Sequence, residues 1–150
     1  MSEKNKDKLG TESPFFALQK IYVKNSSFES PNSAMVFQSE WKPSITLDLN
    51  TFYEPIEEGL YEAVLSIAVT AKNQEKLAFV VEVDQAAMFA ITGFPQQQLD
   101  EALGSACPAV MFPYVRETID HILLKGGFPP LMIAPVNFDA LYTEKNKKSA

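Results

Sequence analysis

The sequence of 150 residues predicts one α+β domain, in which a four-stranded antiparallel sheet packs against a long helix and a short C-terminal helix. Two observations carry this prediction. Between residues 15 and 84, apolar and polar side chains alternate in successive segments, which is typical of half-buried antiparallel strands. From residue 96 onward the apolar residues recur at spacings of three and four, which is typical of a helix with one buried face.

The strands are expected at residues 15–24, 44–50, 61–71 and 77–84, with turns at 51–59 and 72–76. In the first strand the alternation changes phase, which predicts a bulge near Gln19 or Lys20. Residues 30–44 have prolines near both ends and no clear period. They are therefore expected to form a long crossing loop.

The helical part is expected to begin near Gln96, and Pro108 suits the first turn of its second piece. Pro113 lies inside this second piece and should kink it or mark an offset, because proline cannot donate the helical hydrogen bond. Gly126 and Gly127 are expected to end the helix. Asn137 then suits the N-cap of a short last helix, with Leu141 and Tyr142 pointing inward.

Charged and polar residues dominate both ends of the chain, and this composition predicts mobile tails over residues 1–13 and 143–150. The ordered domain is expected over residues 14–142. The formal net charge of -6 argues against a nucleic-acid partner, because such proteins carry clustered Lys and Arg. The polar start lacks the apolar core of a signal peptide, and no apolar run approaches the ~20 residues of a membrane span. Together with a single cysteine, these features predict a cytoplasmic protein without direct membrane insertion.

Catalytic groups are sparse in this sequence. His121 is its one histidine, and no partner for general-base chemistry is indicated beside it. Cys107 precedes Pro108 in an apolar setting, where a free cysteine behaves as a small hydrophobe. No phosphate-binding glycine loop, metal-ligand spacing or nucleophile elbow is present. We therefore expect neither an enzyme nor a bound cofactor or metal.

The most unusual segment is the apolar, proline-rich stretch at residues 126–142. Its prolines exclude a continuous helix or a central strand, so its apolar side chains should lie on a semi-extended segment. Together with the Trp41 loop and the strand at 44–50, it supplies more apolar surface than one sheet face and one helix need. Such surface either completes a core or an oligomer interface, or it binds an apolar partner. The pattern alone leaves both readings open.

Several short motifs make the chain specific. They are FESPN at 28–32, WKP at 41–43, CP at 107–108, FPYVRE at 112–117, FP at 128–129 and APVNFDAL at 134–141. In order and spacing they resemble the SecB family of bacterial protein-export chaperones, over about residues 15–142. The resemblance implies the same α+β fold, assembled as a homotetramer that is a dimer of dimers. It also implies a protein that holds unfolded secretory and outer-membrane precursors in the cytoplasm and passes them to the translocase motor SecA.

The resemblance further implies three sets of site residues. The docking surface for SecA is expected at Glu29, Val80, Glu82 and Asp84, and the oligomer interface at Phe112, Val115, Ile119 and Ile122. The client-binding groove is expected at Phe37, Trp41, Ile45, Leu47, Leu49, Phe128, Leu131, Ile133, Phe138 and Leu141.

Two departures from the family pattern bear on SecA docking. Asn25 stands where relatives often carry an acid, and Lys145, Lys147 and Lys148 lie where many relatives are acidic. Docking of lower electrostatic strength is therefore expected. Two other functions remain open at this stage. One is a SecB-like chaperone dedicated to an antitoxin or another narrow client, and the other is a module that holds a small apolar ligand.

Overall fold

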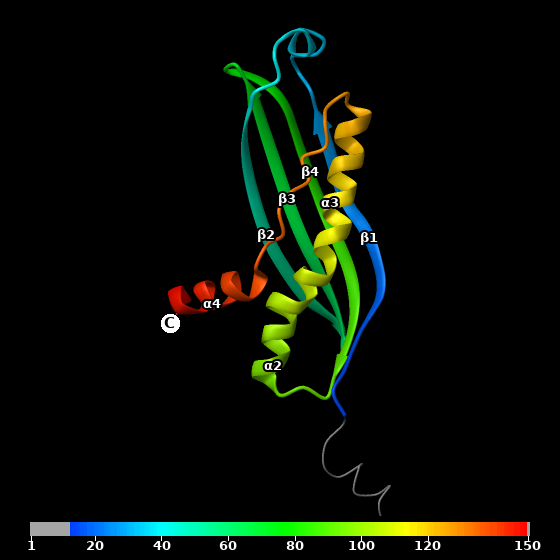
Figure 1. Cartoon of the computed structure of the whole chain (residues 1–150). Coiled ribbons are helices and arrows are strands. Elements are labelled where there is room, and N and C mark those ends of the chain that lie inside the picture. Colours follow the sequence, from blue (N-terminus) through cyan, green and yellow to red (C-terminus); the bar gives the residue numbers. More distant parts are fainter. Residues whose placement is uncertain (1–12, 150) are drawn as a thin grey trace, which may run out of the picture.

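The computed structural model describes residues 13–149, and an antiparallel sheet is its largest element (Figure 1). The strand order is β1-β4-β3-β2, so β1 and β2 form the two edges. This confirms the predicted four-stranded antiparallel sheet. The predicted N-terminal tail at residues 1–13 lies, apart from its last residue, outside the described residues. The strands are β1 (Phe15–Glu29), β2 (Pro43–Glu57), β3 (Leu60–Asn73) and β4 (Lys76–Thr92).

The strands are longer than the sequence predicts, and the predicted turn at 51–59 is wrong for most of its length. Strand β2 continues through Pro55 and turns only at Glu58 and Gly59. Proline is tolerated here because β2 is an edge strand, and edge positions need not donate a ladder hydrogen bond. The predicted bulge in β1 is confirmed between Leu18 and Lys20, and a second irregularity follows at Val23/Asn25.

Helix α2 (Gln96–Glu101), the π turn η2 (Ala102–Ala106) and α3 (Cys107–Lys125) form one nearly continuous helical segment. The irregular turn comes directly before Pro108, whose missing N–H interrupts the regular ladder. The break in α-helical structure therefore lies before Pro108 and not at Pro113, across which α3 is unbroken.

The last helix, α4 (Phe138–Ser149), begins as predicted, because the Asn137 side-chain oxygen accepts the backbone N–H of Ala140 at 3.0 Å. The Ser105 hydroxyl also donates to the Asp139 carboxylate. The helix continues over residues 143–149, where the composition predicts a mobile tail; the Glu and Lys residues there have good helix propensity. Leu141 is 44% exposed, which corrects its predicted inward position.

Helix α3 lies across one face of the sheet, called here the inner face, and leaves the opposite, outer face uncovered (Figure 1). Side chains of β3 and β4 that point to the inner face, such as Leu65, Ile67 and Phe89, are fully buried in the core. The helix contributes buried residues to the same core. Phe112, Val115 and Ile119 are among them, with Ile122 packed against it, so these four face their own sheet and are not an exposed oligomer interface.

Candidate functional site

Phe128 lies at the centre of an aromatic cluster that joins four separate segments. Its ring centroid is 4.9 Å from that of Phe79 on β4, 5.1 Å from Phe37 and 5.5 Å from Trp41 on the crossing loop. Phe28 of β1 packs on the same ring at 6.4 Å. Such pairs add stability beyond their buried area. The cluster therefore fixes the crossing loop and the proline-rich stretch to the same end of the sheet.

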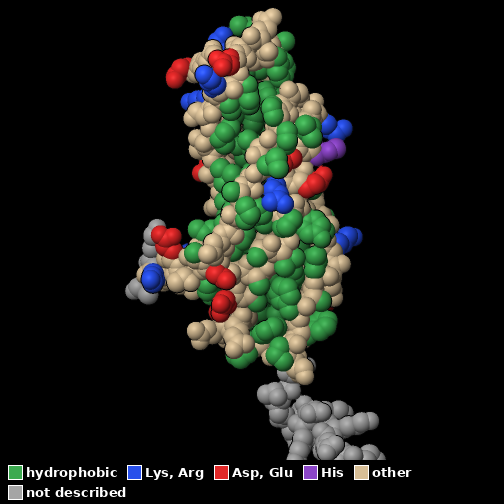
Figure 2. Space-filling view, in the orientation of Figure 1, with side chains coloured by type: hydrophobic (Ala, Val, Ile, Leu, Met, Phe, Trp, Pro, Cys, Tyr) green, Lys and Arg blue, Asp and Glu red, His purple; other side chains and the backbone are tan. Residues whose placement is uncertain are grey.

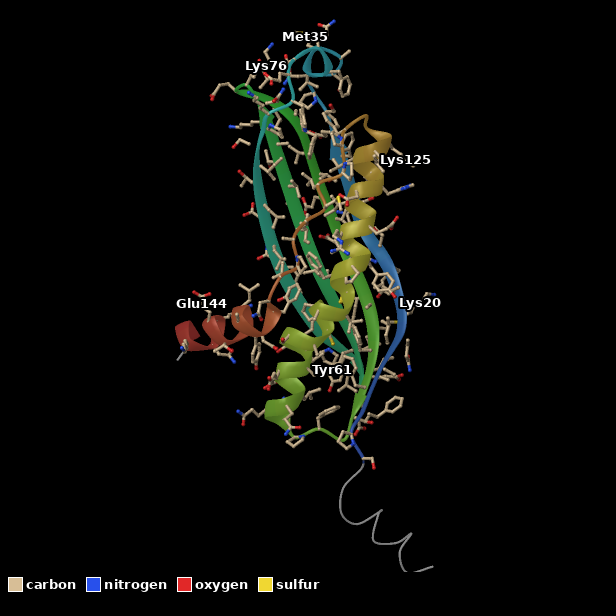
Figure 3. All side chains as sticks on the ribbon, viewed as in Figure 1. Lys20, Met35, Tyr61, Lys76, Lys125 and Glu144 are labelled. Atoms are coloured by element: carbon tan, nitrogen blue, oxygen red, sulfur yellow. The ribbon has the colours of Figure 1, made fainter. Side chains whose placement is uncertain are left out.

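Figure 3 shows this convergence at the level of the elements. Met35 on the crossing loop and Lys76 in the β3–β4 hairpin lie at the same end of the molecule as Lys125, where α3 ends. A short 3-10 turn, η1 (Met35–Gln38), forms inside the crossing loop. The loop that the sequence predicts thus has internal structure and is packed against the aromatic cluster.

Asn73 holds the crossing loop where it enters β2. Its side-chain oxygen accepts the Lys42 backbone N–H at 2.9 Å, and its amide nitrogen donates to the Glu40 carbonyl at 3.1 Å. Asn73 is only 2% exposed, and leaving such a buried amide unpaired would cost about 1–3 kcal/mol. Trp41 lies between these two backbone contacts, so its position is set from both sides.

The proline-rich segment, called here the arm (residues 128–137), runs back over the inner face between α3 and β2 (Figure 1). It starts from Gly127, which has a φ of 88°, a conformation that glycine adopts without strain. The Asp120 carboxylate of α3 then accepts the backbone N–H groups of Leu131 at 2.9 Å and Met132 at 3.3 Å. The arm is therefore tied to the helix at both its start and its middle.

Strand β2 has apolar side chains on the inner face, beyond the part that α3 covers. Ile45 is 40% exposed and Leu47 is 37% exposed, while Leu49 is partly buried. Apolar side chains also gather over this side of the molecule in Figure 2. We call this the inner apolar surface, and it consists of Phe37, Trp41, Ile45, Leu47, Leu49, Leu131 and Ile133.

The structure thus brings together seven of the ten residues predicted for the client groove and leaves three outside the inner apolar surface. Phe128 and Phe138 are 3% and 4% exposed, so they belong to the core and do not line an open surface. The sequence could not separate them from their neighbours, because periodicity is lost in a segment broken by prolines. Leu141 lies on the exposed side of α4, as described above.

The predicted docking residues for SecA lie side by side on the outer face. Glu29 of β1 pairs with Val80 of β4, and the next outward-facing β4 residues along the ladder are Glu82 and Asp84. Asp84 pairs with Asn25 of β1, so a neutral side-chain amide lies beside the last carboxylate of the acidic patch. The Glu29 and Glu82 side chains are exposed and available to a partner.

A polar cluster on the same face was not predicted from the sequence. The Lys24 ammonium lies 2.6 Å from one Glu62 carboxylate oxygen, and the Tyr22 hydroxyl donates to the other. These two hydrogen bonds lower the pKa of the Glu62 carboxyl. Burial, with a smaller effect from Glu62, raises the pKa of Tyr22 to about 12. Pairing across three strands places these side chains together, which the linear sequence does not show.

The candidate catalytic residues find no chemical partners. Cys107 is buried in the core, and burial raises the pKa of its thiol to about 12, so the reactive thiolate is disfavoured. His121 lies on the exposed side of α3. Within residues 13–149, no group of His, Cys, Asp and Glu could hold a metal ion. No helix in the described part of the chain is long and apolar enough to cross a membrane.

An open apolar surface on one side of a sheet, with an acidic patch on the other, defines a binding protein with two separate surfaces. The family model described as "Preprotein translocase subunit SecB" matches residues 10–149. The protein-export protein SecB of Marinobacter nauticus is 56% identical over 135 residues, which cover 90% of this chain and 82% of that protein. The SecB of Hahella chejuensis is 55% identical, with 90% and 85% covered. The chain belongs to the SecB family.

A solved structure supports the fold independently. The SecB-like chaperone of Mycobacterium tuberculosis, in complex with an antitoxin peptide, superposes with a TM-score of 0.64. The match covers 81% of this chain and 90% of that one, at 14% sequence identity. At that identity the likeness concerns the fold.

Proposed function

We propose that this protein is a cytoplasmic export chaperone that binds unfolded secretory and outer-membrane precursors and delivers them to SecA. The observation that carries the proposal is the inner apolar surface, where Ile45 and Leu47 remain exposed beside the arm. An unfolded precursor offers free apolar side chains to such a surface, and a folded protein has already buried them.

The expected strength of one contact suits a protein that must release its client. Burying one client Leu or Phe contributes roughly 1.5–3 kcal/mol, whereas ordering each client residue costs about 1–2 kcal/mol. One surface therefore binds a short segment weakly. Several surfaces on one assembly raise the avidity for a long chain by about 10²- to 10⁴-fold while each contact still releases quickly.

The client-binding proposal is tested by two variants of one strand. Ile45→Glu combined with Leu47→Glu places charge on the inner apolar surface, and we expect loss of binding to a reduced, unfolded precursor. Thr46→Glu changes the residue between them, which points to the outer face, and should leave binding intact. Equal binding by both variants, or binding of the folded precursor, would reject the proposal.

For SecA docking we propose the acidic patch formed by Glu29, Val80, Glu82 and Asp84. A titration of SecA at rising salt concentration tests the electrostatic part, because exposed charge pairs are screened by salt. Glu29→Lys combined with Glu82→Lys should abolish docking. An affinity that ignores both the salt and this double change would argue against the patch.

We further propose self-association into a homotetramer. Because the buried stripe of α3 faces its own sheet, the proposal now rests on the opposite side of the helix, where Val110, Tyr114 and Leu124 are exposed. Light scattering should give a mass of about four times 16.7 kDa. Tyr114→Glu combined with Leu124→Glu is expected to lower that mass, and an unchanged mass would exclude this side of the helix.

A chaperone dedicated to an antitoxin is the second candidate, because the similar fold from Mycobacterium tuberculosis was solved with an antitoxin peptide. The relatives at 55–56% identity are instead protein-export proteins, which favours export. A survey of the proteins that co-purify with this chain separates the two, since a dedicated chaperone would retain one client.

A further inference from the structure

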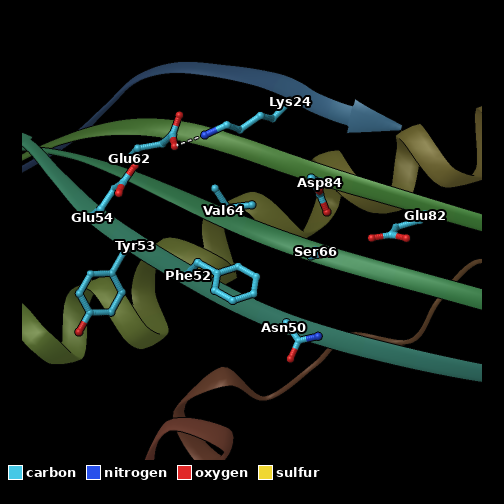
Figure 4. A pocket seen from close by; sticks show the side chains of 10 residues that line it. All are labelled: Lys24, Asn50, Phe52, Tyr53, Glu54, Glu62, Val64, Ser66, Glu82 and Asp84. Atoms are coloured by element: carbon cyan, nitrogen blue, oxygen red, sulfur yellow. Dashed lines mark hydrogen bonds and ion pairs between the residues drawn. The ribbon is translucent and has the colours of Figure 1, made fainter. Parts of the chain in front are cut away.

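The outer face contains a shallow hollow of about 530 Å³, lined by side chains of all four strands (Figure 4). Figure 4 shows Phe52, Val64, Glu82 and Asp84 on the same side of the sheet, where they line the hollow. The Phe52 ring is 58% exposed, because the helices of the described chain lie on the other face of the sheet. An exposed ring on an uncovered sheet face is the unusual feature here.

The ladder pairing places this ring in an apolar row between two polar rows. Phe52 pairs with Val64, which pairs with Ala86, so three strands contribute one apolar row. Two residues along on one side, the row consists of Asn50, Ser66 and Asp84; on the other side it begins with Glu54 and Glu62. Residues two apart on a strand lie about 6.6–6.8 Å apart, so Glu54 lies one such step from Phe52 along β2. On the other side of the apolar row, Asp84 also lies one step away, but two strands across, on β4.

The hollow has a clear excess of negative charge. Its lining holds four carboxylates, at Glu54, Glu62, Glu82 and Asp84, and one ammonium, at Lys24. Glu62 already pairs with Lys24, so the other three acids are not balanced within the hollow. A partner that complements the hollow would therefore carry positive charge on both sides of an apolar side chain.

We propose that this hollow binds an extended basic segment in which an apolar residue lies between two lysines or arginines, each two positions away. The apolar residue packs on Phe52 and Val64, and the flanking cations lie over Glu54 and Asp84. Side chains two positions apart in an extended segment point the same way, and this segment crosses the strands obliquely, because Glu54 is on β2 and Asp84 is on β4. The inference rests on the proposed docking of SecA to the outer face, and it adds an apolar subsite that selects which basic segment docks.

The test uses the whole protein and a fluorescent peptide with the pattern Lys-Ser-Leu-Ser-Lys. Phe52→Ala should weaken binding about tenfold, which is the effect of losing one buried apolar contact. Phe15→Ala is the matched control, because Phe15 is also an exposed phenylalanine, at 54%, and pairs with Thr92 at the end of β1. This control should bind as the wild type does. A peptide with Ser in place of Leu should bind weakly to the wild type and equally weakly to Phe52→Ala.

The outcomes separate this inference from SecA docking itself. If Phe52→Ala binds the peptide and SecA as the wild type does, while Glu29→Lys combined with Glu82→Lys loses SecA, the apolar subsite is rejected and the docking patch stands. If neither variant affects SecA binding, both proposals are rejected. Equal losses in Phe52→Ala and Phe15→Ala would also reject the subsite, because the effect would not depend on the hollow.

Discussion

The carboxylate of Asp120 accepts the backbone N–H of Leu131 at 2.9 Å, which joins the middle of α3 to the middle of the arm. The same oxygen also accepts the Met132 N–H at 3.3 Å. The arm has no regular secondary structure, so these two N–H groups have no backbone partner in a strand or helix. The Asp120 side chain thus provides the hydrogen bonds that a neighbouring strand would otherwise provide, and it sets how closely the arm approaches the helix.

Asp120→Ala is expected to release the arm. Hydrogen bonds to a charged group contribute about 1.5–3 kcal/mol each, and partial exposure reduces this, so we expect a loss of about 1–3 kcal/mol in total. Hydrogen exchange should show faster exchange at Leu131 and Met132. Glu117→Ala, at an exposed position of the same helix, is the control and should leave both amides unchanged. Unchanged exchange in Asp120→Ala would show that the Asp120 hydrogen bonds do not hold the arm in place.

Met132→Asn is expected to stabilise the protein by about 0.5–1 kcal/mol. Met132 has a φ of 50°, a left-handed conformation that costs most residues about 1–2 kcal/mol and that asparagine tolerates better. Its side chain is 74% exposed, so little packing is lost. Chemical denaturation measures the effect. The control is Met35→Asn, another exposed methionine without this backbone conformation, which should give no gain.

Gly104→Ala should displace α4. A Cβ at Gly104 would come within 2.4 Å of the Tyr142 ring, which is closer than any real contact. Overpacking of this kind typically costs about 1–3 kcal/mol. A double-mutant cycle with Tyr142→Ala provides the check, because removal of the ring should abolish the additional cost. If the two costs simply add, the close approach of α4 to η2 is not what limits residue 104.

Acid should weaken the cluster of Tyr22, Lys24 and Glu62. The pKa of Glu62 is lowered by folding, so its contribution to stability is present above the ordinary glutamate value of about 4.3 and is lost as the pH falls through the lower, folded value. Denaturation of the wild type over this range should show that loss, and Glu62→Gln should show less of it. Glu58→Gln, in the exposed β2–β3 turn, is expected to behave as the wild type.

How far the sequence could predict this structure depends on the kind of signal. Regular alternation predicted the sheet, since residues such as Leu65 and Ile67 obey a period of two and are all buried. Turn signals are less reliable. Pro55 favours a turn in the sequence, but it lies in an edge strand, and only the strand order shows that β2 is at the edge. The spacing of three and four correctly predicts one apolar face on α3, but the sequence does not show that this face packs on the sheet of the same chain.

Residues could be proposed for a site where the family pattern names them, and not where distant segments meet. Glu29, Glu82 and Asp84 could be named from the family pattern, whereas the hollow around Phe52 depends on residues of four strands. Phe128 looked like its apolar neighbours in the arm, and only its contacts with Phe79, Phe37 and Trp41 show that it is core. Distant pairings of this kind have no local signature.

Strand β2 carries Ile45 and Leu47 toward one face and Thr46 and Asp48 toward the other, in fixed register with β3. A slip of one residue would reverse every side chain of the strand. Ile45 and Leu47 would then leave the inner apolar surface, and Phe52 would leave the hollow on the outer face. A single-residue insertion within this strand is therefore expected to be far more damaging than any one substitution in it. Insertions and deletions should instead be tolerated in the crossing loop.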